Sequence, residues 1–374
     1  MGLFAILPTF EADDKTLQLK FDEQDEQQVE VSRLALPAEW FPQSGIQLTW
    51  PHERTDWEPM LKDVTKTYLN MTYEIASREL LIIVTPQVDK LKEFISTNLP
   101  QKIQSNIRYA ESPTNDTWAR DHGFITLISE QGCHLLDFKF NGWGEKFPAE
   151  LDNAINKRLF DQNLLNGSYE DHLDFVLEGG SIESDGKGTI FTTSSCLLAD
   201  HRNQPLKKDE IEQRLKKLLN ADRILWIDHG SLIGDDTDGH IDTLVRVAPS
   251  DTLLYVGCED KSDPQYEDLK AMEEQLMTFK TADGNPYRLM KLPMPDAIYD
   301  EEERLPATYA NFLVMNKTVL FPTYNQRYKD EEARKTMQKA FKGYDIVGID
   351  CRPLIRQHGS LHCCTMQYPA GCIQ

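Results

Sequence analysis

Positive charge is scarce in this chain, with 40 Lys and Arg residues against 61 Asp and Glu residues among 374. The formal net charge of −21 disfavours nucleic acids and anionic membrane surfaces as partners, because both are negatively charged. An acidic surface attracts small cations from a distance, although a net charge of this sign also serves solubility alone. We therefore expect a small cationic partner, with no nucleic acid and no membrane.

Cysteine doublets of the metal-binding kind are also missing, because no Cys-X-X-Cys sequence occurs. The seven cysteines lie at positions 133, 196, 258, 351, 363, 364 and 372. This odd number and wide scatter fit a reduced, cytoplasmic protein better than a disulfide framework or a structural zinc site. No apolar run approaches the roughly 18 residues of a membrane span, and the N-terminus lacks the basic region of a signal peptide.

Several catalytic signatures are absent as well. No His-Glu-X-X-His, Walker A or Gly-X-Ser-X-Gly sequence is present, which disfavours a metallohydrolase, a kinase and a serine esterase. The acidic stretch at 235–239 lacks the ligand spacing of an EF-hand calcium loop. A papain-like protease is disfavoured too, because its local signature is missing and its cysteine would lie early in the chain.

The order of secondary-structure signals repeats along the chain, although the residues themselves do not. Apolar residues at helical or strand spacing predict helix, strand and hairpin about five times in succession. We expect helices near 61–75, 88–99, 148–162, 208–219, 264–279 and 330–342. We expect strands near 80–84, 107–112, 173–178, 223–227, 287–292, 344–349 and 361–368, with hairpin turns near 131–132, 185–188, 249–251 and 316–317. Such an array favours similar α/β units packed around one axis, with an ordinary doubly wound α/β sheet as the alternative.

Nothing in the sequence marks a boundary between domains. No later linker is rich in Pro, Gly or Ser, so we expect a single domain over 1–374. Residues 11–33 are acidic and rich in Gln, and we interpret 1–35 as an N-terminal extension of that domain.

Polar residues stand at matching places in the five passes. They are Trp118, Arg120 and Asp121, then Glu178, then His240 and Asp242, then Asn311, and finally His362 and Cys363. If the units share an axis, these segments converge on one centre. A thiol, an imidazole and several carboxylates in one place suggest nucleophilic chemistry on a cationic carbon.

The adjacent Cys363 and Cys364 leave the nucleophile open. In a strand the two side chains point to opposite faces, so one faces a cavity while the other enters the core. His240 and Asp242 are two residues apart, and in a strand they would share a face and enter the same cavity. Most single cysteines are inert core residues, and reactivity needs a neighbouring cation that favours the thiolate.

Guanidinium chemistry fits this set of residues. A guanidinium is planar and permanently charged, and carboxylates match it in bidentate hydrogen bonding. Two aspartates would hold the cation with its central carbon against a thiolate, which the cation would in turn favour. A histidine would protonate the departing ammonia and then deprotonate the water that releases the product.

Short sequences in a fixed order make the chain similar to the agmatine deiminases of the guanidino-group-modifying superfamily, which are related to bacterial peptidyl-arginine deiminases. The sequences that carry the resemblance are Pro37-Ala38-Glu39-Trp40, Trp50-Pro51-His52, Trp118-Ala119-Arg120-Asp121, Leu177-Glu178-Gly179-Gly180-Ser181, Gly239-His240-Ile241-Asp242 and His362-Cys363. Each is weak alone, but their common order is specific. One departure is Gly359-Ser360-Leu361-His362-Cys363, where the family usually has Gly-Asn-Ile-His-Cys.

The resemblance implies a fold, a reaction and residue roles. The fold would be a five-fold pseudosymmetric α/β propeller, and the reaction would convert agmatine to N-carbamoylputrescine and ammonia through an amidino-cysteine intermediate. Cys363 would be the nucleophile, His240 the acid and base, and Glu178 the carboxylate that orients His240. The residues that bind the substrate would be Asp121, Asp242 and Trp118. No metal and no organic cofactor is implied.

Two alternatives use the same residues. Free or peptidyl arginine would be converted to citrulline, but an α-carboxylate calls for a dedicated Arg or Lys that the sequence does not assign. This favours agmatine. A catalytically silent guanidine-binding protein would need the thiol or the imidazole out of place. The oligomeric state is open, with a homo-oligomer as one expectation.

Overall fold

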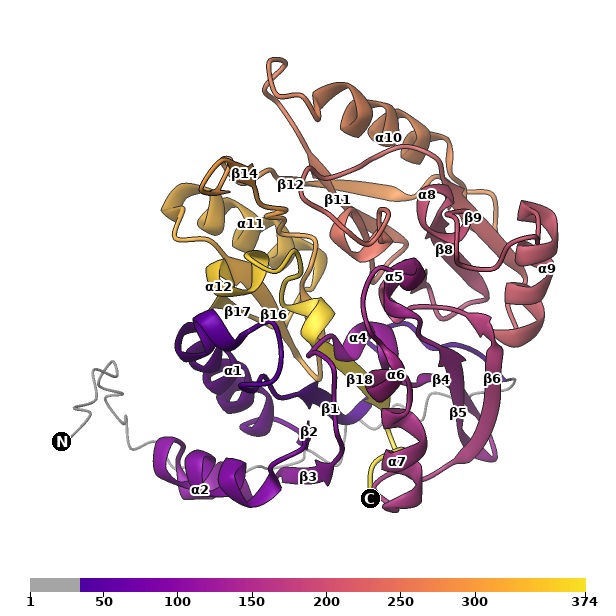
Figure 1. The fold of residues 1–374 in the computed structure, drawn as a ribbon. Coiled ribbons are helices and arrows are strands. Elements are labelled where there is room, and N and C mark those ends of the chain that lie inside the picture. The colour runs from indigo at the N-terminus through magenta and orange to yellow at the C-terminus, as the bar shows by residue number, and fades with distance from the viewer. Residues whose placement is uncertain (1–33) are drawn as a thin grey trace.

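The computed structural model describes residues 34–374, so most of the predicted N-terminal extension at 1–35 lies outside the described residues. The fold is mixed α/β, with five sheets of three or four strands and helices packed against them. In Figure 1 these sheets surround the middle of the molecule, where α4 (Ala119–His122) and the start of β18 (Thr365–Pro369) lie. A separate hairpin consists of β13 (Tyr299–Asp300) and β14 (Glu303–Arg304).

The five larger sheets share one arrangement. In each, a strand pairs antiparallel with one neighbour and parallel with the other. In spatial order the strands are β18, β1 (Gln43–Thr49), β2 (Leu80–Thr85) and β3 (Ile107–Glu111); β4 (Ile125–Ser129), β5 (Gly132–Lys139) and β6 (Ser168–Val176); β7 (Ile182–Ser184), β8 (Thr189–Thr193) and β9 (Arg223–Ile227); β10 (Val245–Ala248), β11 (Thr252–Gly257) and β12 (Arg288–Pro293); β15 (Leu313–Met315), β16 (Thr318–Thr323) and β17 (Asp345–Asp350). The repeated order of elements predicted from the sequence is therefore confirmed.

The longer helices lie close to their predicted places. They are α1 (Leu61–Ala76), α2 (Val88–Asn98), α7 (Ile155–Asp161), α9 (Lys208–Leu218), α10 (Tyr266–Thr278) and α11 (Arg327–Ala340). The shorter ones are η1 (Glu58–Met60), α3 (Gln101–Gln104), α5 (Gly142–Glu145), α6 (Glu150–Asn153), α8 (Ser194–Leu197) and α12 (Arg352–Ile355). In α1 the apolar residues Val64, Tyr68 and Ile75 recur at helical spacing and are fully buried, so the predicted face is the packed face.

The strand β2 shows why a continuous apolar run forms a central strand. Its residues 81–84 are fully buried, and it runs parallel to β1 on one side and β3 on the other. A parallel strand covered on both faces needs apolar side chains in both directions, which an alternating sequence does not provide. The strand predicted at 80–84 is confirmed.

The helix predicted at 148–162 is two short helices, α6 and α7, rather than one. The Asp152 carboxylate accepts hydrogen bonds from the amides of Asn115 at 2.7 Å and Asp116 at 3.0 Å. Asn153 Oδ1 accepts from the Phe140 amide at 2.7 Å. Side chains that bond to a neighbouring backbone compete with a regular helix, so the chain breaks between α6 and α7.

Cys133 in β5 and Cys372 form a disulfide, with their Cα atoms 5.8 Å apart. The expectation that all cysteines are reduced is therefore wrong for this pair. Because 239 residues separate the two cysteines, the spacing of cysteines in the sequence does not indicate that they pair. The other five cysteines of the described residues are free and buried.

The last strand completes the first sheet, because β18 pairs antiparallel with β1. The parts of the chain that follow Pro42 and His362 are thus brought side by side. No helix in the described part of the chain combines the length and the apolar character that crossing a membrane requires.

Candidate active site

Four short helical segments meet in the middle of the molecule, each directly before the first strand of a sheet. They are α4, η2 (Gly179–Ser181), η3 (Ile241–Thr243) and η4 (His362–Cys364). The segment α4 packs against both η2 and η4, and η2 packs against η3. Asn311 takes the matching place before β15. The polar segments that the sequence placed at equivalent positions therefore lie together.

The local structure of these segments differs from the predicted strands. His240 directly precedes the 3₁₀ turn that contains Asp242, and Cys363 lies inside another such turn. The predicted sharing of one strand face by His240 and Asp242 is therefore wrong. The strand alternation predicted for Cys363 and Cys364 is wrong for the same reason.

Two threonines hold these turns closed. The Thr243 hydroxyl donates to the His240 carbonyl at 2.8 Å, and the Thr365 hydroxyl donates to the His362 carbonyl at 2.9 Å. Each hydroxyl reaches back three residues and satisfies a carbonyl that a strand would have paired across a sheet. The turn geometry, rather than the period of a strand, sets the direction of the site side chains.

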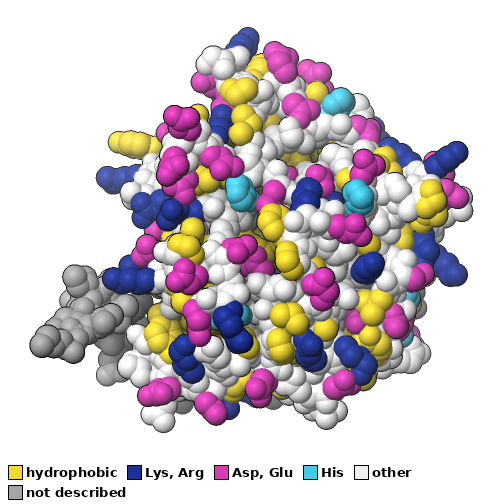
Figure 2. All heavy atoms as spheres, viewed as in Figure 1, with side chains coloured by type: hydrophobic (Ala, Val, Ile, Leu, Met, Phe, Trp, Pro, Cys, Tyr) yellow, Lys and Arg dark blue, Asp and Glu magenta, His cyan; other side chains and the backbone are white. Residues whose placement is uncertain are grey.

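A cavity of about 450 Å³ adjoins these segments, and Trp118, Asp121 and Cys363 all line it. Cys364 points elsewhere, because it is fully buried and lies against Tyr68. The other acidic residues that line the cavity are Asp56, Asp116, Asp236 and Glu303. Figure 2 shows acidic side chains around a hollow near the middle of one face. The cavity therefore offers a thiol within an acidic lining.

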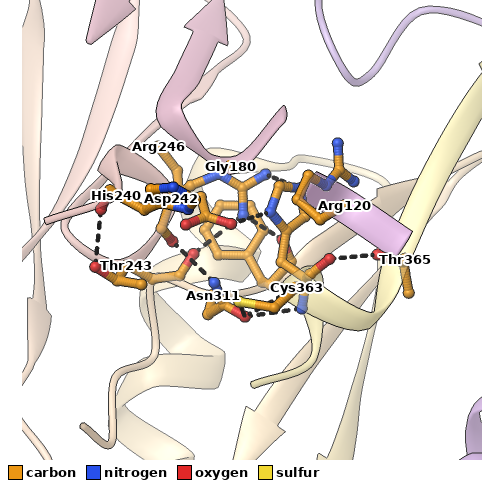
Figure 3. Close-up of polar contacts among 12 residues, drawn as sticks. Arg120, Gly180, His240, Asp242, Thr243, Arg246, Asn311, Cys363 and Thr365 are labelled. Atoms are coloured by element: carbon orange, nitrogen blue, oxygen red, sulfur yellow. Dashed lines mark hydrogen bonds and ion pairs between the residues drawn. The ribbon is translucent and has the colours of Figure 1, made fainter. Parts of the chain in front are cut away.

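Gly180 lies where three polar side chains converge. A Cβ atom there would lie 2.6 Å from His240 Nδ1, 2.8 Å from Asp121 Oδ1 and 3.1 Å from Asp242 Oδ2. Only glycine allows the backbone to come so close to these groups. Figure 3 shows Gly180 in this centre with His240, Asp242 and Cys363. Three of the predicted site residues thus surround one backbone position.

Asp121 accepts hydrogen bonds from two neutral donors. The Gly180 amide nitrogen lies 3.0 Å from Oδ1, and the Trp143 indole nitrogen lies 3.0 Å from Oδ2. Burial, reinforced by the neighbouring carboxylate of Asp242, raises the pKa of Asp121 to about 6. A bound cation would favour the ionised form of this carboxyl group.

Trp143 reaches Asp121 from a left-handed backbone conformation, with φ 57° and ψ 47°, between Gly142 and Gly144. A bulky residue rarely adopts this conformation, and such strain concentrates at functional sites. Asn141 Oδ1 accepts from the Gly144 amide at 3.0 Å and closes the turn. Sequence reasoning missed Trp143, and the Gly-Trp-Gly sequence was the available signal.

Asp242 accepts a hydrogen bond from a histidine instead. His362 Nδ1 lies 2.7 Å from Oδ2, while Oδ1 is buried without a hydrogen-bond partner among the described residues. Burial opposes the charge, but the hydrogen bond and the charge of His362 hold the pKa of Asp242 below its usual value. Asp242 therefore carries a negative charge and one free oxygen.

Asn311 fixes the turn that carries the thiol. Its Oδ1 accepts from the amides of His362 at 2.9 Å and Cys363 at 3.3 Å, and Cys363 Sγ lies 3.4 Å away. Its Nδ2 donates to the Asp242 carbonyl at 3.4 Å. Figure 3 shows this amide between η3 and η4. One side chain thus joins the segment of the thiol to that of a predicted clamp residue.

His240 Nδ1 lies 3.6 Å from Asp121 Oδ1, and neither ring nitrogen makes a hydrogen bond within the described chain. Burial disfavours the imidazolium, but Asp121, Cys196 and Glu178 raise the pKa of His240 well above its usual value. Glu178 was predicted to orient this ring, whereas its Oε1 accepts from Arg202 Nε at 2.8 Å. Glu178 still lies close to His240, because a carboxylate oxygen of Glu178 and a ring nitrogen of His240 are within 4.8 Å of each other.

Burial, together with the charges of Asp242 and Asp121, raises the pKa of Cys363 well above its usual value. The thiol is therefore protonated in the free protein. A guanidinium between the two carboxylates would offset their charge and favour the thiolate.

Two groups of buried side chains could share a metal ion. They are Glu178, Cys196 and His240, and Glu39, Glu183 and His362. Guanidinium groups already pair with both, since Arg202 donates to Glu178, and Arg246 donates to Glu39 and Glu183. These groups therefore act as internal ion pairs in the described structure.

The chain is similar to known proteins along nearly all of its described length. Residues 35–369 match the model of the Porphyromonas-type peptidyl-arginine deiminase family. A protein of Marinomonas sp. (strain MWYL1) with the provisional name agmatine deiminase is 33% identical over 360 residues. That match covers 90% of this chain and 95% of the relative.

Two solved structures share the fold. One from Porphyromonas gingivalis, provisionally named an arginine deiminase, has a TM-score of 0.87 at 47% identity and covers 91% of this chain and 100% of its own. A cysteine-to-serine variant of the C. jejuni agmatine deiminase, with substrate bound, has a TM-score of 0.83 at 36% identity. The covered shares are 91% of this chain and 97% of that one. Because the family model covers residues 35–369, the chain belongs to the Porphyromonas-type peptidyl-arginine deiminase family.

Proposed function

We propose that this protein hydrolyses agmatine to N-carbamoylputrescine and ammonia through a covalent amidino-cysteine intermediate. The observation that carries the proposal is that two buried carboxylates, Asp121 and Asp242, both approach Gly180, and that Asp121 and Cys363 line the same cavity. Such a pair matches a planar cation. The relatives named agmatine deiminase support the choice of reaction.

The lining of the cavity favours agmatine over free arginine. Agmatine carries a second cation, its primary amine, whereas arginine also carries a carboxylate. The cavity has five acidic residues, and Arg356 is the only Lys or Arg among its described lining residues. The Nε of Arg356 already lies 2.8 Å from the Asp300 carboxylate. An α-carboxylate would therefore meet like charge, which lowers affinity for arginine.

Cys363 is the proposed nucleophile. With a guanidinium between Asp121 and Asp242, the thiol releases its proton to solvent water, and the thiolate adds to the guanidinium carbon to form a C–S bond. His240, held as an imidazolium, gives its proton to the departing nitrogen. The C–N bond breaks, ammonia leaves, and a cationic amidino-thioether remains on the enzyme.

A water molecule completes the reaction. The now neutral His240 accepts a proton from the water, whose oxygen attacks the same carbon. The C–S bond breaks, the hydroxyl proton passes to the departing thiolate of Cys363 as the urea group forms, and N-carbamoylputrescine leaves, with the enzyme back in its starting state. Glu178 is proposed to hold His240 in place, and Trp118 to form a wall of the site.

An ammonia-release assay with agmatine, arginine and an arginyl peptide tests the proposal. Agmatine should have the highest kcat/KM. The Cys363→Ala variant should lose turnover and keep agmatine binding in calorimetry, while Cys364→Ala, the matched control, should retain turnover. A preference for arginine would contradict the proposed substrate, and an inactive but folded Cys364→Ala would contradict the proposed nucleophile.

The five similar sheets are proposed to form a five-fold pseudosymmetric α/β propeller within a single domain. The shared strand order supports this arrangement. The pairing of β18 with β1 and the meeting of α4, η2, η3 and η4 support it too. In a propeller each unit would deliver one polar segment to the central site.

A further inference from the structure

A buried carboxylate lies behind the proposed site and takes no part in the mechanism above. Glu39 Oε2 is 3.0 Å from His362 Nε2, although 323 residues separate the two in the sequence. The other ring nitrogen, Nδ1, is 2.7 Å from Asp242 Oδ2. All three side chains are buried. The imidazole therefore bridges a carboxylate of the proposed guanidinium clamp and a second carboxylate behind it.

Arg246 anchors the outer carboxylate. Its guanidinium pairs with Glu39 and, at 2.5 Å, with Glu183, and it donates to two backbone carbonyls. Its Nη2 also lies 3.1 Å from His362 Nε2, so Arg246 and Glu39 meet the ring at the same nitrogen. Glu39 Oε1 also accepts from the Val314 amide at 2.7 Å. Every oxygen of Glu39 thus has a partner, so this carboxylate is a fixed support for the ring of His362.

The bridge engages one oxygen of Asp242 and leaves the other free. A carboxylate only accepts hydrogen bonds, so Nδ1 of His362 carries the proton. The Oδ1 of Asp242 is buried without a partner among the described residues, so it is an unused acceptor that a guanidinium N–H would satisfy. Recognition of a planar cation tolerates only about 10–20° of misorientation, so the direction of this carboxylate matters.

We propose that His362 is a positioning residue for the substrate, because its ring, held by Glu39, orients Asp242 toward the guanidinium. The proposal rests on the proposed function, since it extends the role of Asp242 as one half of the clamp. It also assigns a role to Glu39 in the Pro-Ala-Glu-Trp sequence and to His362 directly before Cys363. Neither residue takes part in a chemical step of the proposed mechanism.

A matched pair of variants tests the proposal, with agmatine binding measured by calorimetry in the Cys363→Ala background. Asparagine at position 362 can place an amide N–H near the position of Nδ1 and keep the bond to Asp242. Glutamine reaches toward the position of Nε2 and keeps only the contact with Glu39. We expect His362→Gln to weaken the Kd at least tenfold, and His362→Asn to weaken it less than threefold. Equal Kd values for the two folded variants would overturn the proposal.

A second pair separates positioning from the removal of charge. Glu39→Gln and Glu183→Gln each remove one negative charge beside Arg246, but only Glu39 makes a hydrogen bond to His362. We expect about a fivefold weaker Kd for Glu39→Gln and less than a twofold change for Glu183→Gln, with thermal melting recorded for both. The same change in Kd for both variants would overturn the proposal.

Chemical rescue gives a readout that a purely structural role would not move. A second cavity, lined by Glu39, Arg120 and His362, reaches the back of the ring. Added imidazole should raise the kcat/KM of His362→Ala at least tenfold. It should leave the kcat/KM of Glu39→Gln unchanged. A folded His362→Ala enzyme that imidazole does not restore would overturn the proposal, and the asparagine and glutamine pair decides if His362→Ala does not fold. If the wild-type enzyme does not turn over agmatine, that result would instead contradict the proposed function.

Discussion

The two sides of the proposed guanidinium site hold the same side chain in different ways. On the side of α4, Asp121 accepts from an amide and an indole, which are both neutral. On the side of η3, Asp242 accepts from His362. The pKa of Asp121 is raised to about 6, whereas the pKa of Asp242 is lowered. Both are buried, but of the two only Asp242 accepts a hydrogen bond from a histidine, and this bond with the charge of His362 lowers its pKa.

Because of this difference, the two carboxylates would contribute to the binding of a cation in different ways. The lowered pKa of Asp242 favours its ionised form, so this carboxylate would attract a cation in the proposed site. The pKa of Asp121 is raised to about 6, so this carboxyl group gains a proton as the pH falls below 6, and a bound cation would favour its ionised form.

The largest expected effect on activity comes from replacing each of the two carboxylates in turn. Asp242→Asn should lower kcat/KM by about three decades and Asp121→Asn by about two, since loss of one partner of a buried charge pair costs roughly 3–5 kcal/mol. The ordering follows from the permanent charge of Asp242. Ammonia release at pH 6 measures both, and losses below tenfold for both variants would contradict the clamp.

Gly180→Ala should disturb both sides at once. The new methyl group would lie 2.6 Å from His240 Nδ1 and 2.8 Å from Asp121 Oδ1, so these groups must shift. Misplacement by about 1 Å costs on the order of a hundredfold in rate. Gly284→Ala strains the backbone through its φ of 83° but meets nothing within 4 Å, so it is the control for a general loss of stability away from the site. Unchanged kinetics of Gly180→Ala would show that the convergence is not required.

The pH dependence of binding isolates the Asp121 side. The pKa of Asp121 is raised to about 6, so below pH 6 a proton must leave before the cation is bound. The Kd of Cys363→Ala for agmatine should therefore weaken about tenfold per pH unit below 6 and level off above it. Asp116 also lines the cavity and has its pKa raised to about 6 by burial, so Asp116→Asn is the required control. The dependence should disappear in Asp121→Asn and persist in Asp116→Asn.

Trp143→Phe should give the smallest effect. It removes the indole donor to Asp121 Oδ2, and a hydrogen bond that favours the charged form lowers a pKa. The acid limb of agmatine binding should therefore move to higher pH by about one unit. In an Asp121→Asn background the same change should add nothing, because its target is gone. A shift that persists there would place the effect of Trp143 elsewhere.

The sequence predicted those parts of the molecule that depend on neighbours in the chain. The apolar spacing of α1 and the uninterrupted run of β2 identify a packed helix face and a central strand. The polar segments before each first strand were also predicted to lie together, and they do. The chemical roles of Cys363, His240 and Glu178 stay predictions.

What the sequence could not supply depends on contacts across long separations. The 3₁₀ turns around Asp242 and Cys363 are held by hydroxyl groups rather than by any period in the chain. The pairing of Arg246 with Glu39 spans 207 residues, and no local pattern announces it. Trp143 sits in a backbone conformation that propensities assign to glycine or asparagine.

The pairing of β18 with β1 has a consequence for the order in which the proposed site forms during protein synthesis. A chain that grows from its N-terminus makes Cys363 after the other residues of the site, and η4 is placed only when β18 joins β1. Such a distant contact forms late, because a long loop must close first. A ribosome-bound intermediate would thus carry the acidic residues and His240 of the proposed site before Cys363, the proposed nucleophile, is in place.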